Sequence, residues 1–193
     1  MTKQRLLFLG PPGAGKGTQA QHLAARHQLL HLSTGDLLRA EVAAATALGQ
    51  EAAAVMARGE LVSDALVLAI VRSRLEQQAA SLSRGEPGAS GWLLDGFPRN
   101  LAQAEALEAL LSELNQPIEL VVLMELDDDL LMQRLLGRGR ADDNAEVIRH
   151  RLEVYRQQTA PLIAYYRQRQ LLEAVDAEGS IEAIATRIEG LLA

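Results

Sequence analysis

The chain has 193 residues, of which 48% are hydrophobic and 23% are charged, and its net charge is −6. This balance is typical of one globular domain with a sizeable core, and the negative charge argues against general nucleic-acid binding. Disulfides and thiolate metal sites are excluded because there is no cysteine. No apolar run reaches the roughly 20 residues that cross a bilayer or resembles a signal peptide, so we expect a cytoplasmic protein without membrane contact.

Short apolar runs alternate with helical patterns along the chain. Their near-continuous apolar character predicts parallel strands covered on both faces, at 5–9, 29–32, 92–94, 119–126 and 171–175. Helices are expected at 17–27, 36–45, 50–58, 65–79, 101–114, 143–168 and 180–192. The alternation predicts an α/β fold with a doubly wound parallel sheet of five strands. The Ser- and Gly-rich stretch 81–91 predicts an exposed loop without an assigned role.

The first turn, GPPGAGKGT at 10–18, lies between a predicted strand and a predicted helix. Glycines allow the backbone to wrap closely, and a helix N-terminus directs unpaired amides at an anion, so this arrangement is typical of a phosphate site. Residues 10–16 match the first seven positions of the P-loop pattern, while Gly17 stands where Ser or Thr is usual and Thr18 follows. Lys3 and Lys16 are the only lysines among 19 lysines and arginines, and a compact charge at Lys16 suits phosphate binding.

This variant loop resembles that of the nucleoside monophosphate kinases, and of the adenylate kinases in particular. STGDLLR at 33–39, LLDGFPRNLAQ at 93–103, GRADDN at 139–144 and RLEVYRQQTAPLIAYY at 151–166 occur in that family in the same order, so the resemblance covers the whole chain. It implies the P-loop nucleoside monophosphate kinase fold in a single domain. The implied parts are a core (1–32, 63–137 and 144–193), a nucleoside-monophosphate-binding arm (33–62) and a short lid (138–143).

The resemblance also implies a seat for ATP and its magnesium ion. Asp95 follows a predicted strand, at the carboxyl end where ligands bind in open α/β sheets, and it is expected to hold Mg²⁺ through water. Gly179 is expected to lie with its backbone against the ATP adenine. The residues implied for ATP are Gly13, Ala14, Gly15, Lys16, Gly17, Thr18, Arg138 and Gly179.

The acceptor nucleotide is implied to be AMP. The carboxamide of Gln103 can accept from adenine N6 and donate to N1. Relatives that phosphorylate UMP or CMP carry Asn in this place and Ala in place of Thr34, so the pair Thr34 and Gln103 favours AMP. The residues implied for AMP are Thr34, Arg39, Glu60, Leu61, Val62, Gly96, Phe97, Pro98, Arg99, Gln103, Arg140 and Arg151.

Six arginines lie close together in the second half of the chain: Arg134, Arg138, Arg140, Arg149, Arg151 and Arg156. Two nucleotide anions repel one another, and guanidinium groups offset that repulsion with suitable geometry. The resemblance assigns catalytic roles to Lys16, Arg99, Arg138, Arg140 and Arg151. Arg134 and Arg156 are instead expected on a solvated helix face.

The lid is short, because a single glycine separates Arg138 from Arg140. Longer relatives insert about thirty residues there, sometimes with a four-cysteine zinc site. Without cysteine, and with four histidines that form no metal motif, no zinc is expected. Asp142 and Asp143 are expected to order the arginines or to cap the long helix that follows.

The function implied is reversible transfer of the terminal phosphoryl of MgATP to AMP, giving two ADP, by a monomer. A phosphate oxygen is the nucleophile and is ionised at neutral pH, so no general base is expected. A UMP/CMP kinase of the same fold is one alternative. An inactive relative that serves as a binding module is another. A P-loop GTPase is a third alternative, disfavoured because no Asn/Thr-Lys-x-Asp motif for guanine occurs.

Overall fold

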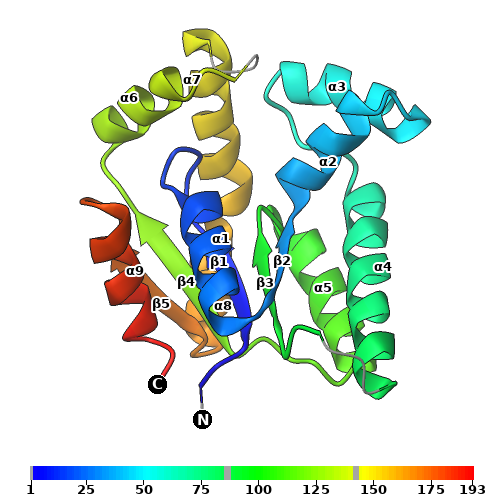
Figure 1. Ribbon diagram of the computed structural model, residues 1–193. Helices are drawn as coiled ribbons and strands as arrows, with labels where there is room; N and C mark the ends of the chain where they lie inside the picture. The colour runs from blue at the N-terminus through cyan, green and yellow to red at the C-terminus, as the bar shows by residue number, and fades with distance from the viewer. Residues whose placement is uncertain (1, 85–87, 141–143) are drawn as a thin grey trace.

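The computed structural model describes residues 2–84, 88–140 and 144–193 (Figure 1). Its centre is one sheet of five parallel strands in the order β2-β3-β1-β4-β5, which confirms the predicted α/β architecture. The strands are β1 (Arg5–Leu9), β2 (Leu30–Ser33), β3 (Trp92–Asp95), β4 (Leu120–Glu125) and β5 (Leu172–Asp176).

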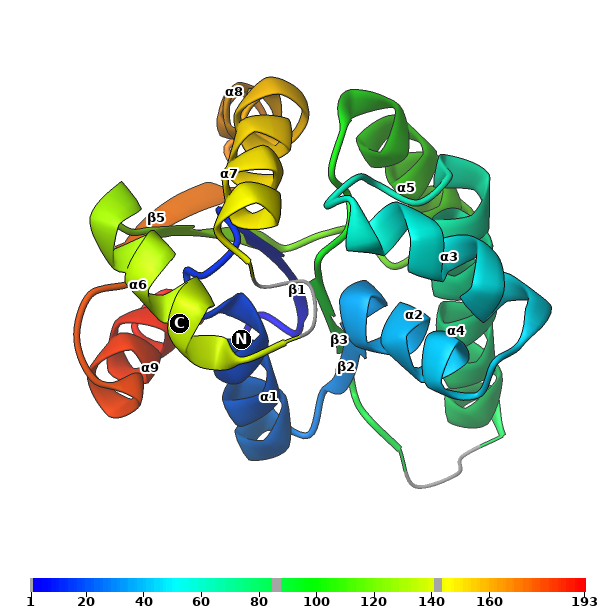
Figure 2. The ribbon, with the colours of Figure 1, turned by 90° about the horizontal axis from the view of Figure 1, so that it is seen from above.

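Helices cover both faces of this sheet, as Figure 2 shows from above. Before β4 they are α1 (Lys16–His27), α2 (Thr34–Ala43), α3 (Ala47–Ala57), α4 (Asp64–Ser83) and α5 (Leu101–Glu113). After β4 they are α6 (Asp128–Arg138), α7 (Ala145–Val154), the π-helical turn η1 (Tyr155–Thr159), α8 (Pro161–Gln168) and α9 (Ile181–Glu189).

Successive residues of β1 pack into two separate cores. Leu7 and Leu9 lie in the core formed with α4, α5 and α8, whereas Leu6 and Phe8 lie in the core formed with α1 and α9. All four side chains are at most 2% exposed. Both faces of the strand therefore require apolar residues, which explains why its sequence is continuously apolar rather than alternating.

One helix, α6, was not among the predicted elements. Asp127 caps its N-terminus by accepting a hydrogen bond from the backbone nitrogen of Asp129 at 2.9 Å, and Gly139 ends it with a φ of 72°. Leu131 and Leu135, one turn apart, are its buried residues. The helix carries Arg138, so it positions a predicted site residue.

The single helix predicted over 143–168 is three segments, α7, η1 and α8. Asn144 caps α7 by accepting from the backbone nitrogen of Val147 at 2.9 Å. The turn η1 inserts a π-helical register, and Pro161 then begins α8, where the missing N–H is tolerated. The predictions for Asp142 and Asp143 fall outside the described residues.

Helix α4 is longer than predicted, so residues 81–83 of the predicted loop are helical. Gln78 is 9% exposed and holds the end of the predicted loop in place. Its Nε2 donates to the carbonyl oxygens of Ala89 at 3.0 Å and Gly91 at 2.6 Å. Within the described parts of the chain, no helix is long and apolar enough to cross a membrane.

The carboxyl ends of the three strands β1, β3 and β2 lie level with one another. Asp95 is in register with Phe8 on one side and with Ser33 on the other. Helices α2 and α3 rise above this edge on one side, and α6 and α7 rise on the other (Figure 1). The loops that leave these strands therefore meet at a single edge, where α/β proteins bind ligands.

Candidate functional site

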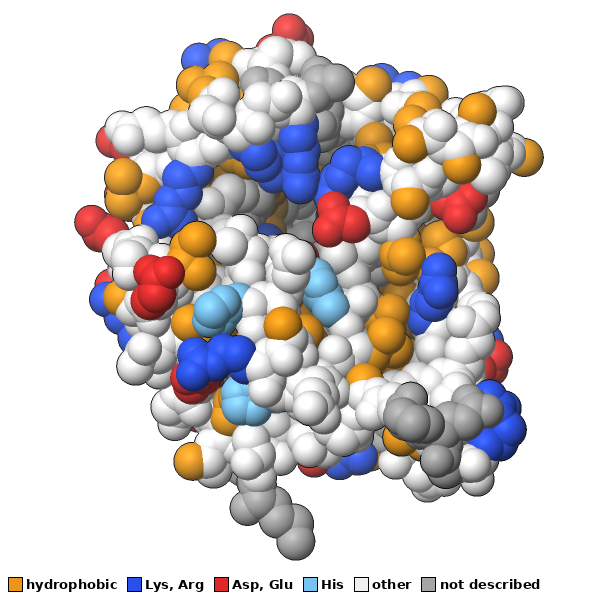
Figure 3. Space-filling model, in the orientation of Figure 1, with side chains coloured by type: hydrophobic (Ala, Val, Ile, Leu, Met, Phe, Trp, Pro, Cys, Tyr) orange, Lys and Arg blue, Asp and Glu red, His pale blue; other side chains and the backbone are white. Residues whose placement is uncertain are grey.

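A cleft of about 800 Å³ opens at this edge of the sheet. Its walls come from the loop after β1, the start of α2, the loop after β3, and the facing sides of α6 and α7. Figure 3 shows Lys and Arg side chains gathered around the hollow between the two groups of helices. The cleft is therefore electropositive although the chain as a whole is acidic.

The structure brings nearly every predicted site residue into this one cleft. The exception is Phe97, whose side chain is 1% exposed and belongs to the core beneath. The predicted residues that line the cleft are Gly13, Ala14, Gly15, Lys16, Gly17, Thr18, Thr34, Arg39, Glu60, Leu61, Val62, Asp95, Gly96, Pro98, Arg99, Gln103, Arg138, Arg140, Arg151 and Gly179.

The glycine loop packs tightly against its neighbours. Gly10 has a φ of 142°, and a Cβ there would lie 2.5 Å from the carbonyl oxygen of Met124 in β4. Gly13 has a φ of 89°, and a Cβ there would lie 2.9 Å from Leu135 Cγ in α6. Both positions require glycine, because the backbone conformation and the close approach each exclude a side chain.

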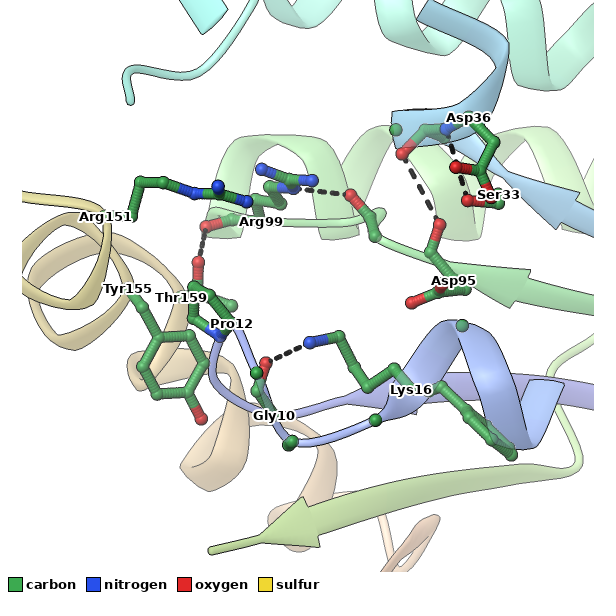
Figure 4. A pocket seen from close by; sticks show the side chains of 18 of the residues that line it. Gly10, Pro12, Lys16, Ser33, Asp36, Asp95, Arg99, Arg151, Tyr155 and Thr159 are labelled. Atoms are coloured by element: carbon green, nitrogen blue, oxygen red, sulfur yellow. Dashed lines mark hydrogen bonds between the residues drawn. The ribbon is translucent and has the colours of Figure 1, made fainter. Parts of the chain in front are cut away.

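Lys16 lies at the first turn of α1 with its ammonium group inside the loop. Its Nζ donates to the carbonyl oxygen of Gly10 at 2.7 Å (Figure 4) and to that of Pro11 at 2.9 Å. The pKa of Lys16 is lowered from 10.5 to about 8, chiefly by burial, and the nearby carboxylate of Asp95 opposes this change. The positive charges of Arg99, Arg151 and Arg138 contribute to the lowering. A phosphate group bound here would offset both the desolvation of the ammonium group and its repulsion by the neighbouring cations.

Asp95 ends β3 beside the glycine loop and is 8% exposed. A Cβ added to Gly17 would lie 3.2 Å from Asp95 Oδ2, so the carboxylate faces the start of α1. Thr34 Oγ1 donates to the backbone oxygen of Asp95 at 3.4 Å. At Gly96, with a φ of 83°, a Cβ would approach Thr34 Oγ1 to 2.9 Å. Glycine therefore permits the start of α2 to lie against this loop.

Arg99 is held at several points on the opposite side of the cleft. Its Nε donates to the carbonyl oxygen of Gly96 at 2.7 Å, and its own carbonyl oxygen accepts from Thr159 Oγ1 at 2.7 Å. Figure 4 shows the side chains of Arg99 and Arg151 pointing toward one another. Burial lowers the pKa of Arg99, and the charge of Arg151 lowers it further. Two guanidinium groups in this arrangement favour an anion between them.

The start of α2 carries a second charged group. Arg39 forms an ion pair with Asp36, and Arg140 Nη2 lies 4.0 Å from Asp36 Oδ1. Burial alone would raise the pKa of Asp36, but hydrogen bonds from Arg39 and Ser33 and the charges of both arginines hold it below its usual value. Asp36 therefore links the 33–62 segment to Arg140, which lies across the cleft.

The cleft is also lined by residues that were not predicted as site residues from sequence, among them Arg134, Tyr155 and Thr159. The expectation of a solvated face is wrong for Arg134, which is partly buried and donates to the carbonyl oxygen of Ala177 at 3.1 Å. Arg134 lies four residues before Arg138, a spacing that places both on one face of α6. The expectation is confirmed for Arg156, which pairs with Asp128 and has 51% of its side chain exposed.

Comparisons with known proteins agree with this geometry. A family model described as adenylate kinase matches residues 8–171. Among curated relatives, the adenylate kinase of Synechococcus sp. strain RCC307 is 71% identical over 189 residues, covering 98% of each chain. That of Synechococcus sp. strain WH7803 is 70% identical over 191 residues, covering 99% of this chain and 100% of the relative. With its five-stranded parallel sheet, its P-loop and these matches along nearly its whole length, the chain belongs to the adenylate kinase family.

Proposed function

We propose that this chain transfers the terminal phosphoryl group of MgATP to AMP, reversibly, giving two molecules of ADP. The observation that carries the proposal is the joining, in one electropositive cleft, of a P-loop with Lys16 and a second group containing Thr34, Arg99 and Gln103. The adenylate kinase names of the relatives support the same reaction.

The phosphate groups of the two nucleotides are assigned to the middle of the cleft. Lys16 and the amides at the start of α1 hold the phosphates of ATP, together with Arg138. Arg99, Arg140 and Arg151 hold the transferring phosphoryl group and the phosphate of AMP. The lowered pKa values of Lys16 and Arg99 support this assignment, because both cations are buried near other cations and the carboxylate of Asp95 only partly opposes these effects.

The adenine bases are assigned to the two ends of the cleft. Thr34, Gln103, Val62 and the backbone at 60–62 form the seat of the AMP base. Gly179 lies at the opposite end, where its backbone is assigned to the ATP base. Both ends belong to the same continuous cleft, which supports the binding of two nucleotides face to face.

Asp95 fits a magnesium ion bound with the ATP phosphates. It is a buried carboxylate beside Gly17, and its oxygen atoms are the ligand type that Mg²⁺ prefers. In the described part of the chain no three His, Cys, Asp or Glu side chains form a metal cluster, which suits an ion held largely by water and phosphate. When bound, magnesium neutralises charge on the phosphate oxygens during transfer.

The transfer needs no general base in this proposal. The attacking group is a phosphate oxygen of AMP, and its second pKa of ~6 leaves it ionised at neutral pH. Lys16 and the arginines contribute by orienting the phosphates in line and by stabilising the negative charge. The partial burial of Lys16, Arg99 and Arg151 at the sheet edge strengthens these interactions relative to water.

Water must be kept from the terminal phosphoryl group. The proposed division of the domain into a core (1–32, 63–137 and 144–193), an arm (33–62) and a short lid (138–143) provides for this, because closure of the arm over the core excludes water. The approach of Asp36 in the arm to Arg140 at 4.0 Å supports contact between the two sides.

We also propose that the protein is a cytoplasmic monomer. Size-exclusion chromatography tests its oligomeric state.

A coupled assay for ADP tests the function. ATP with magnesium is supplied alone and then with AMP, CMP, UMP or GMP in turn. We expect rapid ADP formation with AMP, slow formation with the other monophosphates, and little hydrolysis of ATP alone. Preference for CMP or UMP would favour a pyrimidine nucleotide kinase, and no turnover with any acceptor would refute the proposal.

A further inference from the structure

The carboxamide of Gln103 is held by protein groups at both of its polar atoms. Gln103 is 3% exposed and lines the cleft. Its Oε1 accepts a hydrogen bond from the backbone nitrogen of Arg99 at 2.6 Å, and its Nε2 donates to Asp64 Oδ1 at 2.6 Å. Each amide atom keeps one further hydrogen-bonding position, an acceptor on Oε1 and a donor on Nε2.

These two contacts fix which way the amide faces. The backbone N–H of Arg99 can only donate, and the ionised carboxylate of Asp64 can only accept. A 180° rotation of the Gln103 amide would place its NH₂ group against that N–H and its oxygen against the carboxylate. Both contacts of the rotated amide would be repulsive, so the observed orientation is strongly favoured.

Asp64 is the first residue of α4 and is not among the residues that line the cleft. Its carboxylate also accepts from Asn100 Nδ2, at 3.1 Å on Oδ1 and 3.2 Å on Oδ2. Asn100 in turn caps α5 by accepting from the backbone nitrogen of Gln103 at 2.8 Å. Asp64 therefore holds the start of α5 and the Gln103 side chain together from outside the cleft.

We propose that Asp64 is a positioning residue that determines the purine selectivity of the acceptor site. Adenine presents a donor at N6 and an acceptor at N1, which match the remaining acceptor and donor of the held amide. A 6-oxopurine presents the reverse pattern, an acceptor at O6 and a donor at N1, which only the rotated amide would match. The inference rests on the proposed function, since it requires Gln103 to contact the acceptor base.

The test compares AMP with inosine 5′-monophosphate, a 6-oxopurine nucleotide, as acceptors for MgATP. Asp64→Asn keeps the shape but offers an amide N–H, so it tolerates the rotated Gln103. We expect the ratio of kcat/KM for AMP to that for inosine monophosphate to fall about tenfold, because one of two restraints, a charge-assisted one, is lost. Asp64→Glu keeps the carboxylate, so we expect its ratio to lie closer to that of wild type than the ratio of Asp64→Asn does. Circular dichroism and the melting temperature report on the fold.

Glu76→Gln is the matched control, because it removes the same charge from an exposed position on the same helix. It is expected to leave the ratio unchanged, since Glu76 contacts neither Gln103 nor the cleft. If Asp64→Asn does not fold, Asp64→Ala is measured in its place, with the same expectation.

The outcomes separate the inference from the proposed function. If wild type phosphorylates AMP and Gln103→Leu lowers the ratio, but the Asp64 variants do not, the role of Asp64 is overturned and the function stands. If Gln103→Leu leaves the ratio unchanged, the base is recognised elsewhere and the inference is overturned. If wild type does not use AMP at all, the proposed function fails and the inference fails with it.

Discussion

Thr159 donates its hydroxyl hydrogen to the backbone carbonyl oxygen of Arg99, at 2.7 Å and across 60 positions of sequence. Thr159 ends the π-helical turn η1, and Arg99 follows β3. Helix α7, which carries Arg151, runs directly into that turn. The hydrogen bond therefore joins the segment that positions Arg151 to the segment that positions Arg99, whose side chains face one another in the cleft (Figure 4).

Thr159→Val is expected to lower kcat/KM for AMP about tenfold, because a small displacement of the guanidinium group of Arg99 or Arg151 weakens its binding to phosphate. The variant is nearly isosteric but lacks the donor. Since Thr159 is 6% exposed, we also expect a loss of ~1–3 kcal/mol in the free energy of unfolding, measured by denaturant titration.

Thr159→Ser is the matched control for this prediction, because it retains the hydroxyl group and loses only a methyl group. Its kcat/KM for AMP is expected to stay near that of wild type. If the valine variant matched wild type in kcat/KM for AMP, the link between η1 and Arg99 would have no part in positioning the arginines.

The turn η1 illustrates what the sequence does not predict. Residues 143–168 have a continuous helical pattern, and a π-helical register depends on contacts made in the folded state, such as that of Thr159 with Arg99. Helix α6 was missed for a related reason. It begins within the acidic run at 127–129, and only Leu131 and Leu135 among its residues are buried. Arg134 was placed on a solvated helix face because it belongs to a run of charged residues.

The strands and the glycine loop were predictable, because local sequence dictates them. Leu6, Leu7 and Phe8 must all be apolar in a strand covered on both faces. Gly10 and Gly13 stand where the backbone has positive φ and touches its neighbours. The anchoring of Gln103 by Asp64 was not predictable, because two residues 39 positions apart meet only once α4 and α5 pack.

Lys16→Met tests the central cation of the cleft. We expect kcat to fall by about 10²–10³, because the ammonium group stabilises charge on the transferring phosphoryl group. Circular dichroism should remain that of wild type. Lys3→Met is the matched control, since it removes the other lysine, whose Nζ donates to the carbonyl oxygen of Leu191 at 2.6 Å near the chain termini. Turnover near the wild-type rate in the Lys16 variant would contradict the assigned role.

The pKa of Lys16 predicts an alkaline limit to activity. In the nucleotide-free protein its pKa is lowered to about 8, so the ammonium group deprotonates above that pH. We expect kcat/KM for ATP to fall above pH 8, approaching about tenfold per pH unit. Bound phosphate favours the charged form, so the corresponding limb of kcat should lie at higher pH. Initial rates from pH 6 to 10 measure both profiles.

The same pKa shift predicts the sign of a stability change. The unfolded chain holds the Lys16 proton up to about 10.5, whereas the folded protein releases it near 8. Between these pH values the unfolded state binds more protons than the folded state. The contribution of Lys16 to the free energy of unfolding therefore increases as the pH rises. Lys16→Met should lack that gain, and a difference between the two proteins that does not change between pH 8 and 10.5 would contradict the lowered pKa.

The double variant Gln103→Asn with Thr34→Ala tests how the acceptor base is recognised. Asparagine is one methylene shorter, so its amide cannot keep both contacts, with the Arg99 nitrogen and with Asp64, and still reach the base. The loss of Thr34 Oγ1 also removes the bond to the backbone oxygen of Asp95. We expect the preference for AMP over CMP and UMP to fall by at least about tenfold in competition assays, because a site built to hydrogen-bond one base discriminates through those bonds.

The two single variants apportion the effect between the residues. An unchanged preference in the double variant would place recognition of the base on the backbone at 60–62 or on the apolar wall formed by Val62 and Val67.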